Sequence, residues 1–249
     1  MITTSRAQDV NARKRRADRI MDAASELLLR WGYKRVTMDD VAAHAGIGKG
    51  TVYLHYRTRE ELFYSVIMRE QANATAELIE ALRKDPREAL LHRLVRLKYL
   101  TMMQRPILKA LVAADPDILG RLVKSVDTAD LARLQGLVST DYFQILIDHQ
   151  LVRPGLTVNE LFYAVGALAI GFFAGDTFLE AFGSRPTLQR RADLLESAIE
   201  RAFSLPASEE VLRRIAPAVL ELYTKSNEIS HAYLQRAYKV RSPGTGDAS

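Results

Sequence analysis

The chain has 249 residues, of which 48% are hydrophobic and 26% charged, so it can bury a core and is not a disordered protein. It contains no cysteine, which excludes disulfides and thiolate metal sites and fits a cytoplasmic location. The net charge of +5 is concentrated in residues 1–59, which hold 12 Lys or Arg against 6 Asp or Glu. This excess favours a polyanionic partner, although a solvated basic tail has the same composition.

The first part of the chain predicts a basic arm followed by one helix. Residues 1–16 are polar and include the basic run 13–16, so we expect a flexible arm that lies along phosphates or is disordered. Apolar residues then recur on one helical face over 17–31, and Gly32 is a natural stop.

The stretch 37–62, TMDDVAAHAGIGKGTVYLHYRTREEL, has the pattern of a helix-turn-helix followed by a third, capped helix. Thr37 and Asp40 make a capping-box-like pair, and Gly46 allows a tight turn with a positive φ. The small and apolar residues on either side of this turn suit two helices that cross at a steep angle. A helical corner that does not bind DNA satisfies the same rules.

Polar and small residues dominate the second helix of this pair, over 49–55, and mostly lie off its buried face. Lysine, threonine and tyrosine side chains there can reach phosphates or base edges. The next helix opens with a T-R-E-E capping box at 58–61, which places Arg59 in its first turn. A cation at that end opposes the helix dipole, and a neighbouring phosphate explains it better than simple exposure to solvent.

The segment from Ile20 to Leu62 closely resembles the DNA-binding domain of the tetracycline-repressor (TetR) family, over less than a fifth of the chain. The resemblance is carried by Ala23, Ala24, Leu27, Gly32-Tyr33, Thr37, Val41-Ala42, Ala45-Gly46-Ile47, Lys49-Gly50-Thr51-Val52-Tyr53, His55-Tyr56 and Thr58-Arg59-Glu60-Glu61-Leu62. It implies contacts to the backbone of double-stranded DNA from Thr37, Lys49, Tyr53, His55 and Arg59. It also implies base contacts from Gly48, Gly50 and Thr51. Gly48 replaces a frequent serine, which weakens a hydroxyl cap, and Arg59 replaces the usual lysine, which keeps the charge.

The rest of the chain predicts an all-α protein. Helices are expected over about 60–83, 86–104, 106–114, 127–150, 161–182, 187–203 and 208–238, with a further one opened by Asp115-Pro116. Pro217 is expected to kink or divide the last helix. The apolar stretch 161–175 is too short to span a bilayer comfortably, so no membrane partner is expected.

Three glycines in one apolar helix point to a close helix–helix contact. The helix 157–182 carries Gly166, Gly171 and Gly175, and each glycine costs about 1 kcal/mol of helix stability relative to alanine. The resemblance implies that the helices at about 157–182 and 187–204 form a four-helix interface in a homodimer, and the alternative is an intramolecular core. The segment 208–238 either covers the core or extends that interface.

The resemblance also implies an effector site in the larger domain. The candidate lining residues are Tyr99, Met102, Met103, Tyr142, Phe143, Phe162, Phe172, Phe173 and Asp176. Aromatic and methionine residues at helical spacing are more often plain core, and Asp176 is the polar candidate in an apolar helix. The five histidines lack metal-ligand spacing and no catalytic motif is recognisable, so we expect no metal, no cofactor and no enzyme activity.

These features predict a flexible basic arm (1–16), an N-terminal three-helix DNA-binding domain (17–62), a larger helical ligand-binding and dimerisation domain (63–240) and a disordered tail (241–249). The function implied by the resemblance is a homodimeric repressor that a small, mostly apolar effector releases from a palindromic operator. Two alternatives stay open. One is an architectural or activating DNA-binding protein of the same fold without an effector, and the other is an enzyme with an accessory DNA-binding domain.

Overall fold

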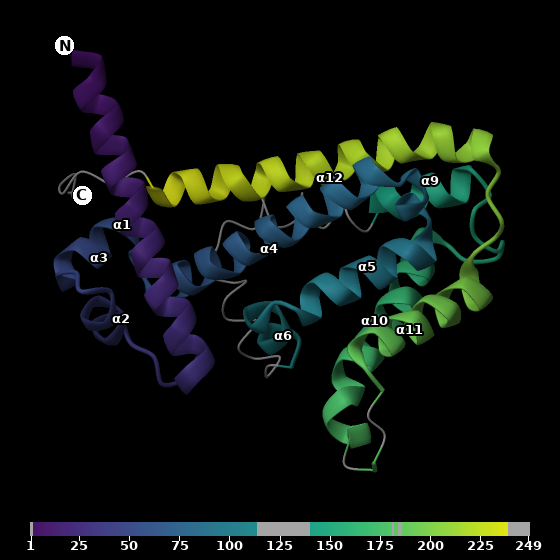
Figure 1. Ribbon diagram of the computed structural model, residues 1–249, viewed down its shortest axis with the longest axis horizontal. Coiled ribbons are helices and arrows are strands. Elements are labelled where there is room, and N and C mark those ends of the chain that lie inside the picture. Colours follow the sequence, from purple (N-terminus) through teal and green to yellow (C-terminus); the bar gives the residue numbers. More distant parts are fainter. Residues whose placement is uncertain (1, 114–139, 181, 184–185, 239–249) are drawn as a thin grey trace, which may run out of the picture. The chain divides into compact units, whose positions relative to one another are not determined.

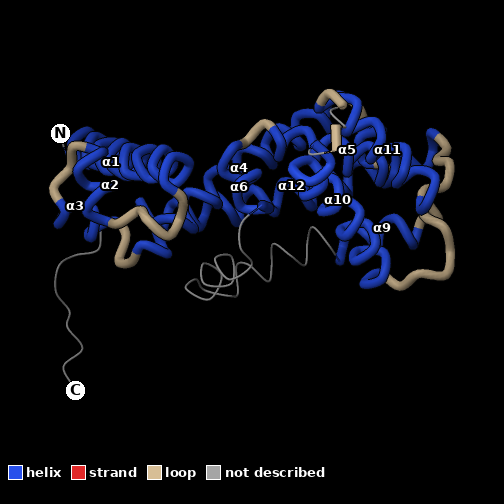
Figure 2. Tube along the Cα trace, turned by 90° about the horizontal axis from the view of Figure 1, so that it is seen from below, coloured by secondary structure: helices blue, strands red, loops and turns tan. Residues whose placement is uncertain are grey.

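Helices account for the regular structure of the protein. The computed structural model describes residues 2–113, 140–180, 182–183 and 186–238. Figure 1 gives their order, and Figure 2 shows helices and loops but no strand in the described part of the chain. The elements are α1 (Ile2–Trp31), α2 (Met38–Ala45), α3 (Lys49–His55), α4 (Arg59–Lys84), the 3-10 helix η1 (Pro86–Ala89), α5 (Leu91–Met103), α6 (Pro106–Ala113), α9 (Tyr142–Asp148), α10 (Val158–Glu180), α11 (Leu188–Phe203) and α12 (Glu209–Tyr238). The predicted all-α class is confirmed.

The chain forms two compact units. Of the described residues, 2–70 and 230–238 belong to the N-terminal unit, and 71–113 and 140–229 belong to the larger unit. Both α4 and α12 therefore contribute residues to each unit. The domain boundary expected after residue 62 stays a prediction. The helix opened by Asp115, the first part of the expected 127–150 helix and the tail 241–249 lie outside the described residues.

The first helix is longer than its apolar pattern suggests, because α1 begins at Ile2 and includes most of the expected flexible arm. No glycine or proline occurs between residues 2 and 31, and alanine, arginine, lysine and glutamine are good helix formers. Nothing in this composition prevents the helix from beginning well before residue 17. The buried face of α1 lies in its second half, where the most enclosed side chains are Ile20, Met21, Ala24 and Leu27.

The last turns of α12 complete the N-terminal unit. Leu234 is 3% exposed, and the ring of Tyr233 meets the ring of Tyr64 edge-on with centroids 5.0 Å apart. The Tyr238 hydroxyl donates a hydrogen bond to the Asp18 carboxylate at 3.1 Å. The end of the chain's last helix is therefore part of the same core as α1 and the beginning of α4.

The first half of α12 belongs to the core of the larger unit, through buried residues such as Leu212, Ile215 and Val219. Pro217 was expected to kink or divide this segment, and it does not divide it, because it lies inside α12 and the helix continues beyond it. Its side chain is exposed, so water can satisfy the backbone carbonyl that loses its helical partner. The segment 208–238 is thus one helix that covers core in both units.

The larger unit is built on α5 and α11. The Arg96 guanidinium of α5 bridges the Asp193 and Glu196 carboxylates of α11 at 3.0 and 3.1 Å. Where one helix was expected over 86–104, the chain instead forms η1 and then α5. Asp85 caps η1 by accepting from the backbone of the second residue after it, and an extended Leu90 separates the two helices.

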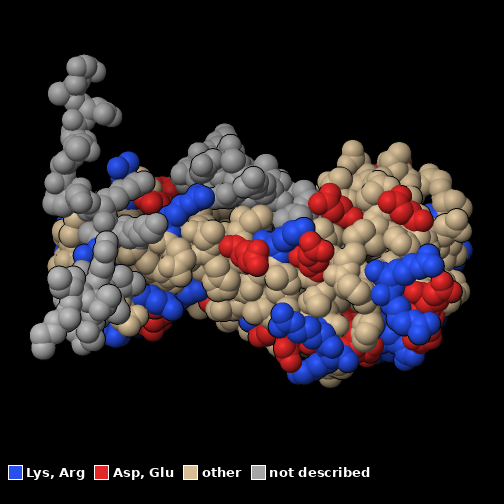
Figure 3. All heavy atoms as spheres, turned by 90° about the horizontal axis from the view of Figure 1, so that it is seen from above, with Lys and Arg blue, Asp and Glu red and all other residues tan. Residues whose placement is uncertain are grey.

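The apolar helix α10 begins at the expected capping box and leaves much of its surface uncovered. The Glu160 carboxylate accepts from the Thr157 amide and hydroxyl at 2.8 and 2.7 Å. Tyr163 and Ile170 are 77% and 59% exposed. By length and composition alone, Val158–Gly175, which begins three residues before the apolar stretch 161–175, could cross a membrane. The larger unit otherwise has a mixed surface, and Figure 3 shows basic side chains beside acidic ones there.

Candidate functional site

The helix-turn-helix opens with a complete capping box. The Thr37 hydroxyl accepts from the Asp40 amide at 3.2 Å, and the Asp40 carboxylate accepts from the Thr37 amide and hydroxyl at 2.9 and 2.6 Å. These hydrogen bonds hold the pKa of Asp40 below its usual value. The carboxylate stays ionised at the start of α2, where the helix dipole favours a negative charge. Thr37 is exposed, but its hydroxyl already serves as a cap.

The turn between α2 and α3 is fixed by a left-handed glycine. Gly46 has φ 62°, and the Ile47 amide donates to the Ala42 carbonyl at 3.0 Å. This 6→1 bond is part of a Schellman motif, which favours glycine because a side chain at positive φ is strained. Arg19 of α1 donates to the Ala45 carbonyl at 2.7 Å, so a cation also satisfies the C-terminal end of α2.

The outer side of α3 carries most of the residues expected to touch DNA. Val52 is fully buried and anchors the helix on the unit. The surrounding predicted residues face outward or lie at its margin: Gly48, Lys49, Gly50 and Tyr53 are exposed and Thr51 is half-buried. Tyr53 is 44% exposed, which leaves a large aromatic side chain with a terminal hydroxyl at the surface. Such a surface suits contacts to phosphates and base edges.

Lys49 is held beside α2 by an ion pair. Its ammonium lies 2.8 Å from the Asp39 carboxylate, and both side chains are more than half exposed. The hydrogen bond and the charge of Asp39 raise the pKa of Lys49, so it is a cation at neutral pH. An exposed pair of this kind contributes little to stability and can exchange its partner for a phosphate.

His55 does not join these residues on the outer face. It follows Val52 by three positions, so the two share one side of α3, and His55 is 6% exposed. Its ring centroid lies 6.2 Å from that of Tyr56, which is fully buried. The expected DNA contact of His55 would therefore require its side chain to leave the interior.

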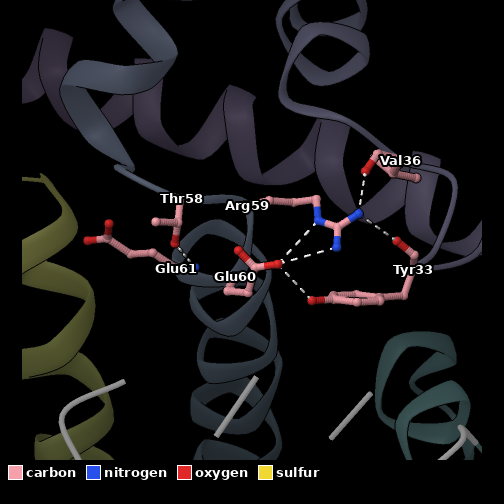
Figure 4. Close-up of polar contacts among 6 residues, drawn as sticks. All are labelled: Tyr33, Val36, Thr58, Arg59, Glu60 and Glu61. Carbon is pink, nitrogen blue, oxygen red and sulfur yellow. Dashed lines mark hydrogen bonds and ion pairs between the residues drawn. The ribbon is translucent and has the colours of Figure 1, made fainter. Parts of the chain in front are cut away.

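Arg59 is turned toward its own domain (Figure 4). Its guanidinium donates to the carbonyl oxygens of Tyr33 and Val36 at 3.5 and 3.4 Å and pairs with the Glu60 carboxylate at 3.3 Å. The guanidinium carbon lies 4.6 Å from the centroid of the Tyr33 ring, within cation–π distance. These contacts tie the first turn of α4 to the loop between α1 and α2, and only 30% of the side chain is exposed.

Glu60 connects the same groups from the other side. It accepts from the Tyr33 hydroxyl at 3.1 Å as well as from Arg59. Burial alone would raise the pKa of Glu60, but hydrogen bonds from its own backbone and from Tyr33, together with the charge of Arg59, lower it on balance. Glu60 is therefore ionised at neutral pH. Half of the predicted capping box forms here, since the Thr58 hydroxyl accepts from the Glu61 amide at 3.0 Å (Figure 4). The Glu61 carboxylate accepts from the Arg57 amide at 2.7 Å, one residue before the expected partner Thr58.

Comparison with known proteins identifies this helix-turn-helix. Residues 20–66 match the family described as bacterial regulatory proteins, tetR family. This N-terminal domain is a TetR-family domain. The match covers α2, α3 and the beginning of α4, and it includes every residue of the turn, the outer face of α3 and the Arg59 network. The resemblance stated from the sequence is confirmed.

Curated relatives match about a quarter of the chain. The HTH-type transcriptional regulator YhgD of Bacillus subtilis is 38% identical over 64 residues, which is 24% of this chain and 34% of YhgD. The HTH-type transcriptional activator FasR of Mycolicibacterium smegmatis is 34% identical over 71 residues, which is 28% of this chain and 32% of FasR. The chain thus spans about a third of the length of these relatives.

Solved structures resemble a larger part of the chain. The protein SCO4942 of Streptomyces coelicolor is 25% identical, with a TM-score of 0.53 over 76% of this chain and 98% of that protein. SmeT, the repressor of the Stenotrophomonas maltophilia multidrug efflux pump SmeDEF, has been solved with triclosan. That complex gives a TM-score of 0.58 at 18% identity, over 79% of this chain and 93% of SmeT, and at this identity it shows a shared fold alone. The two-part helical architecture expected from the sequence is confirmed.

The residues expected to bind an effector divide between two hollows of the larger unit. Six line a cavity of about 170 Å³ between α5, α9 and α10: Tyr99, Met102, Tyr142, Phe143, Phe162 and Phe173. Phe172 lines a separate and larger groove, and Met103 packs against the core without lining either. Asp176 lies in α10, but its side chain is outside the described part of the structure.

The cavity has one charged lining residue that was not expected from the sequence. Lys98 lies in α5 and lines the cavity beside the aromatic rings. The sequence held a signal for it, because Lys98 is four residues from both Leu94 and Met102 and so lies on the buried side of its helix.

Proposed function

We propose that this TetR-family protein is a cytoplasmic transcriptional regulator that binds double-stranded DNA as a homodimer. The observation that carries the proposal is the capped and tightly turned helix-turn-helix, whose second helix presents exposed Lys49, Gly50 and Tyr53. A helix of this kind enters the major groove with its outer face toward the bases. The names of the relatives support a regulator rather than an enzyme.

The outer face of α3 would supply both kinds of DNA contact. Lys49 and the Tyr53 hydroxyl would bind phosphates, and Gly48, Gly50 and Thr51 would lie nearest the base edges. Glycines let the helix approach the groove closely, since they add no side chain between the backbone and the bases. The Thr37 hydroxyl already caps α2. Thr37 would therefore contact phosphate together with those backbone groups at the start of α2 that the capping box does not use.

The phosphate role of α3 has a direct test. The double substitution Lys49→Ala and Tyr53→Phe should weaken binding to every DNA sequence to a similar extent. Loss of one charge contact should also reduce the slope of log affinity against log salt concentration by about 0.9. Fluorescence anisotropy over a salt series measures both effects, with Lys84→Ala as the control because Lys84 is 74% exposed on α4 in the larger unit. Unchanged affinity and slope in the double variant would contradict the proposal.

The homodimer would form through α10 and α11. A groove of about 630 Å³ runs between them, lined by small and apolar residues that include Gly171, Gly175 and Leu194. Large apolar side chains beside it are exposed, with Ile170 at 59% and Leu179 at 51%. Exposed apolar area of this extent on a soluble protein favours an interface. A second copy of α10 and α11 offers the same surface and satisfies the requirement of a two-fold contact.

A single added side chain can test this interface without disturbing the subunit. A Cβ at Gly171 meets no atom within 4 Å, so Gly171→Leu should leave each subunit folded and fill the groove. We expect a mainly monomeric protein by light scattering at micromolar concentration. Ala76→Leu, at an exposed position of α4, adds the same side chain and should leave the dimer intact. A Gly171→Leu protein that is still fully dimeric would show that the subunits meet elsewhere.

The larger unit would set the affinity of the dimer for DNA through a small effector. The cavity of about 170 Å³ is the candidate site, because five aromatic rings surround it. An effector that binds one arrangement of the dimer better than another shifts the population toward that arrangement. If that arrangement no longer fits two half-sites at once, DNA is released and the regulator acts as a repressor.

A further inference from the structure

Lys98 is a cation on the wall of an apolar cavity. It lies in α5, half-buried, and its ammonium is 5.0 Å from the centroid of the Tyr223 ring. Among the described residues that line the cavity it is the only charged one. Burial lowers the pKa of Lys98 to about 8, so the amine is still mostly protonated at neutral pH.

The neighbouring arginines are paired, whereas Lys98 has only an aromatic ring beside it in the described structure. Arg96 pairs with two carboxylates of α11 at 3.0 and 3.1 Å, and Arg105 pairs with Glu77 at 2.7 Å. The contact of a cation with a ring is worth less than the cost of burying an unpaired charge. An anion placed in the cavity would supply the counter-charge that the ring does not provide.

The rest of the cavity wall suits a flat apolar body. The rings of Tyr99 and Phe173 lie 4.9 Å apart, and those of Phe143 and Phe162 lie 6.1 Å apart. The volume of about 170 Å³ is slightly larger than the apolar cavity of roughly 150 Å³ that is known to hold one benzene molecule. The space therefore accepts a single ring with one small substituent.

We propose that this cavity binds a monocyclic aromatic carboxylate, with its carboxylate paired to the Lys98 ammonium and its ring among the aromatic side chains. This inference rests on the proposed function in one respect: if the protein is an effector-controlled regulator, its effector would be a small aromatic acid. The pairing accounts for the lysine, because a neutral ligand of the same shape would leave the buried ammonium without a counter-charge. The site thereby selects an acid over its amide or hydrocarbon analogue.

Benzoate and benzamide form the matched pair that tests this. Isothermal calorimetry with the full-length protein in the absence of DNA should show binding of benzoate and at least about tenfold weaker binding of benzamide, as expected for one charge-assisted hydrogen bond. Lys98→Met should weaken benzoate by about tenfold or more and remove the preference. Lys98→Arg should keep the preference, because it keeps the charge. Lys84→Met, on an exposed part of α4, should bind both ligands like the unmodified protein.

The outcomes separate this inference from the DNA-binding proposal. Equal affinity for benzoate and benzamide, unchanged benzoate affinity in Lys98→Met, or no binding of either ligand would each overturn it. Circular dichroism and thermal melting establish that each variant is folded, and a misfolded Lys98→Met leaves the benzoate–benzamide comparison in the unmodified protein as the deciding result. Binding to DNA is measured separately, so a protein that binds DNA but not benzoate keeps its proposed function and loses this ligand class.

Discussion

Arg59 donates to two backbone carbonyls of the loop between α1 and α2, and the loop is thereby fastened to the start of α4. Glu60 and Tyr33 complete this arrangement with their own hydrogen bond. The orientation of α2 and α3 depends on where this loop lies, since the loop leads directly into α2. We therefore interpret Arg59 as a residue that positions the helix-turn-helix.

Replacing Arg59 should affect stability before it affects phosphate contacts. Arg59→Met removes hydrogen bonds from a charged donor and leaves Glu60 without its cation, so we expect a loss of about 1–3 kcal/mol in the free energy of unfolding. Arg59→Lys should recover only part of it, because the guanidinium reaches the two carbonyls through Nη1 and the Glu60 carboxylate through Nε and Nη2, and a single ammonium cannot replace all three nitrogens. Urea denaturation measures the loss. The salt slope of DNA binding should stay unchanged in Arg59→Met.

The opposite result has an equally clear meaning. A stable Arg59→Met protein whose salt slope falls by about 0.9 would show that Arg59 leaves the loop and binds a phosphate. That is the role implied by the TetR resemblance, and it stays a prediction until this comparison is made.

Rules that involve only residues close together in the sequence predicted the caps and the turn of the site, but not the burial or direction of its longer side chains. The cap at Thr37 and the positive φ of Gly46 follow from contacts within a few residues, and both are present. The burial of His55 and the direction of Arg59 depend on partners far away in sequence, such as Val36 for Arg59. Sequence patterns contain no information on which of several nearby groups a long side chain chooses.

At the scale of elements, the end of α12 is needed by the N-terminal unit. Leu234 is 3% exposed and lies beside the Tyr233–Tyr64 ring pair. Leu234→Ala should therefore destabilise this unit by about 2–5 kcal/mol, the usual range for truncating a buried leucine. His231→Ala is the control, because His231 is exposed on the same helix. Hydrogen exchange of α1 amides reports on the unit directly, and unchanged protection in Leu234→Ala would contradict this role of α12.

Within α5, the buried amine of Lys98 should make stability depend on pH. Its pKa of about 8 lies below the ordinary lysine value of 10.5, so between these two pH values the unfolded chain binds more protons than the folded one. The contribution of Lys98 to the free energy of unfolding therefore rises with pH between about 8 and 10.5, and it is lowest below pH 8. Lys98→Met removes the titration, so the variant should be more stable than the unmodified protein at pH 7, by on the order of 2 kcal/mol.

The same comparison at higher pH provides the check. The stability advantage of the Lys98→Met variant over the unmodified protein should shrink by pH 10, because the Lys98 amine of the folded protein is then largely neutral. Taking the difference between the two proteins cancels the other groups that titrate in this range. Equal differences at pH 7 and pH 10, or a Lys98→Met protein that is less stable at pH 7, would show that the amine is not held in an apolar environment.

Helix boundaries set by side-chain caps were predictable, and those set by packing were not. The capping boxes at 37–40 and 157–160 gave the starts of α2 and α10. The start of α1 and the 3-10 helix before α5 were missed, and Pro217, expected to kink or divide its segment, does not divide it. In these places the sequence allows more than one arrangement, and the helix that forms is the one that tertiary contacts support.

At the level of the whole molecule, the proposed function requires two copies of α3 in one particle. The excess positive charge of residues 1–59 belongs to the N-terminal unit, whereas the exposed apolar surface of α10 and α11 belongs to the larger unit. The first property suits DNA and the second suits a second copy of the chain. A two-fold dimer would carry two copies of α3, and the DNA that it prefers would contain the same half-site twice in inverted orientation.

Selection of bound DNA from a random pool tests this claim most directly. The full-length protein should enrich a site made of two inverted half-sites whose centres are about one helical turn apart, or somewhat more. The dimer-breaking Gly171→Leu variant should lose this enrichment, whereas Ala76→Leu should retain it. Enrichment of a single, non-repeated half-site by the unmodified protein, or no enrichment of duplex DNA at all, would contradict a homodimeric DNA-binding regulator.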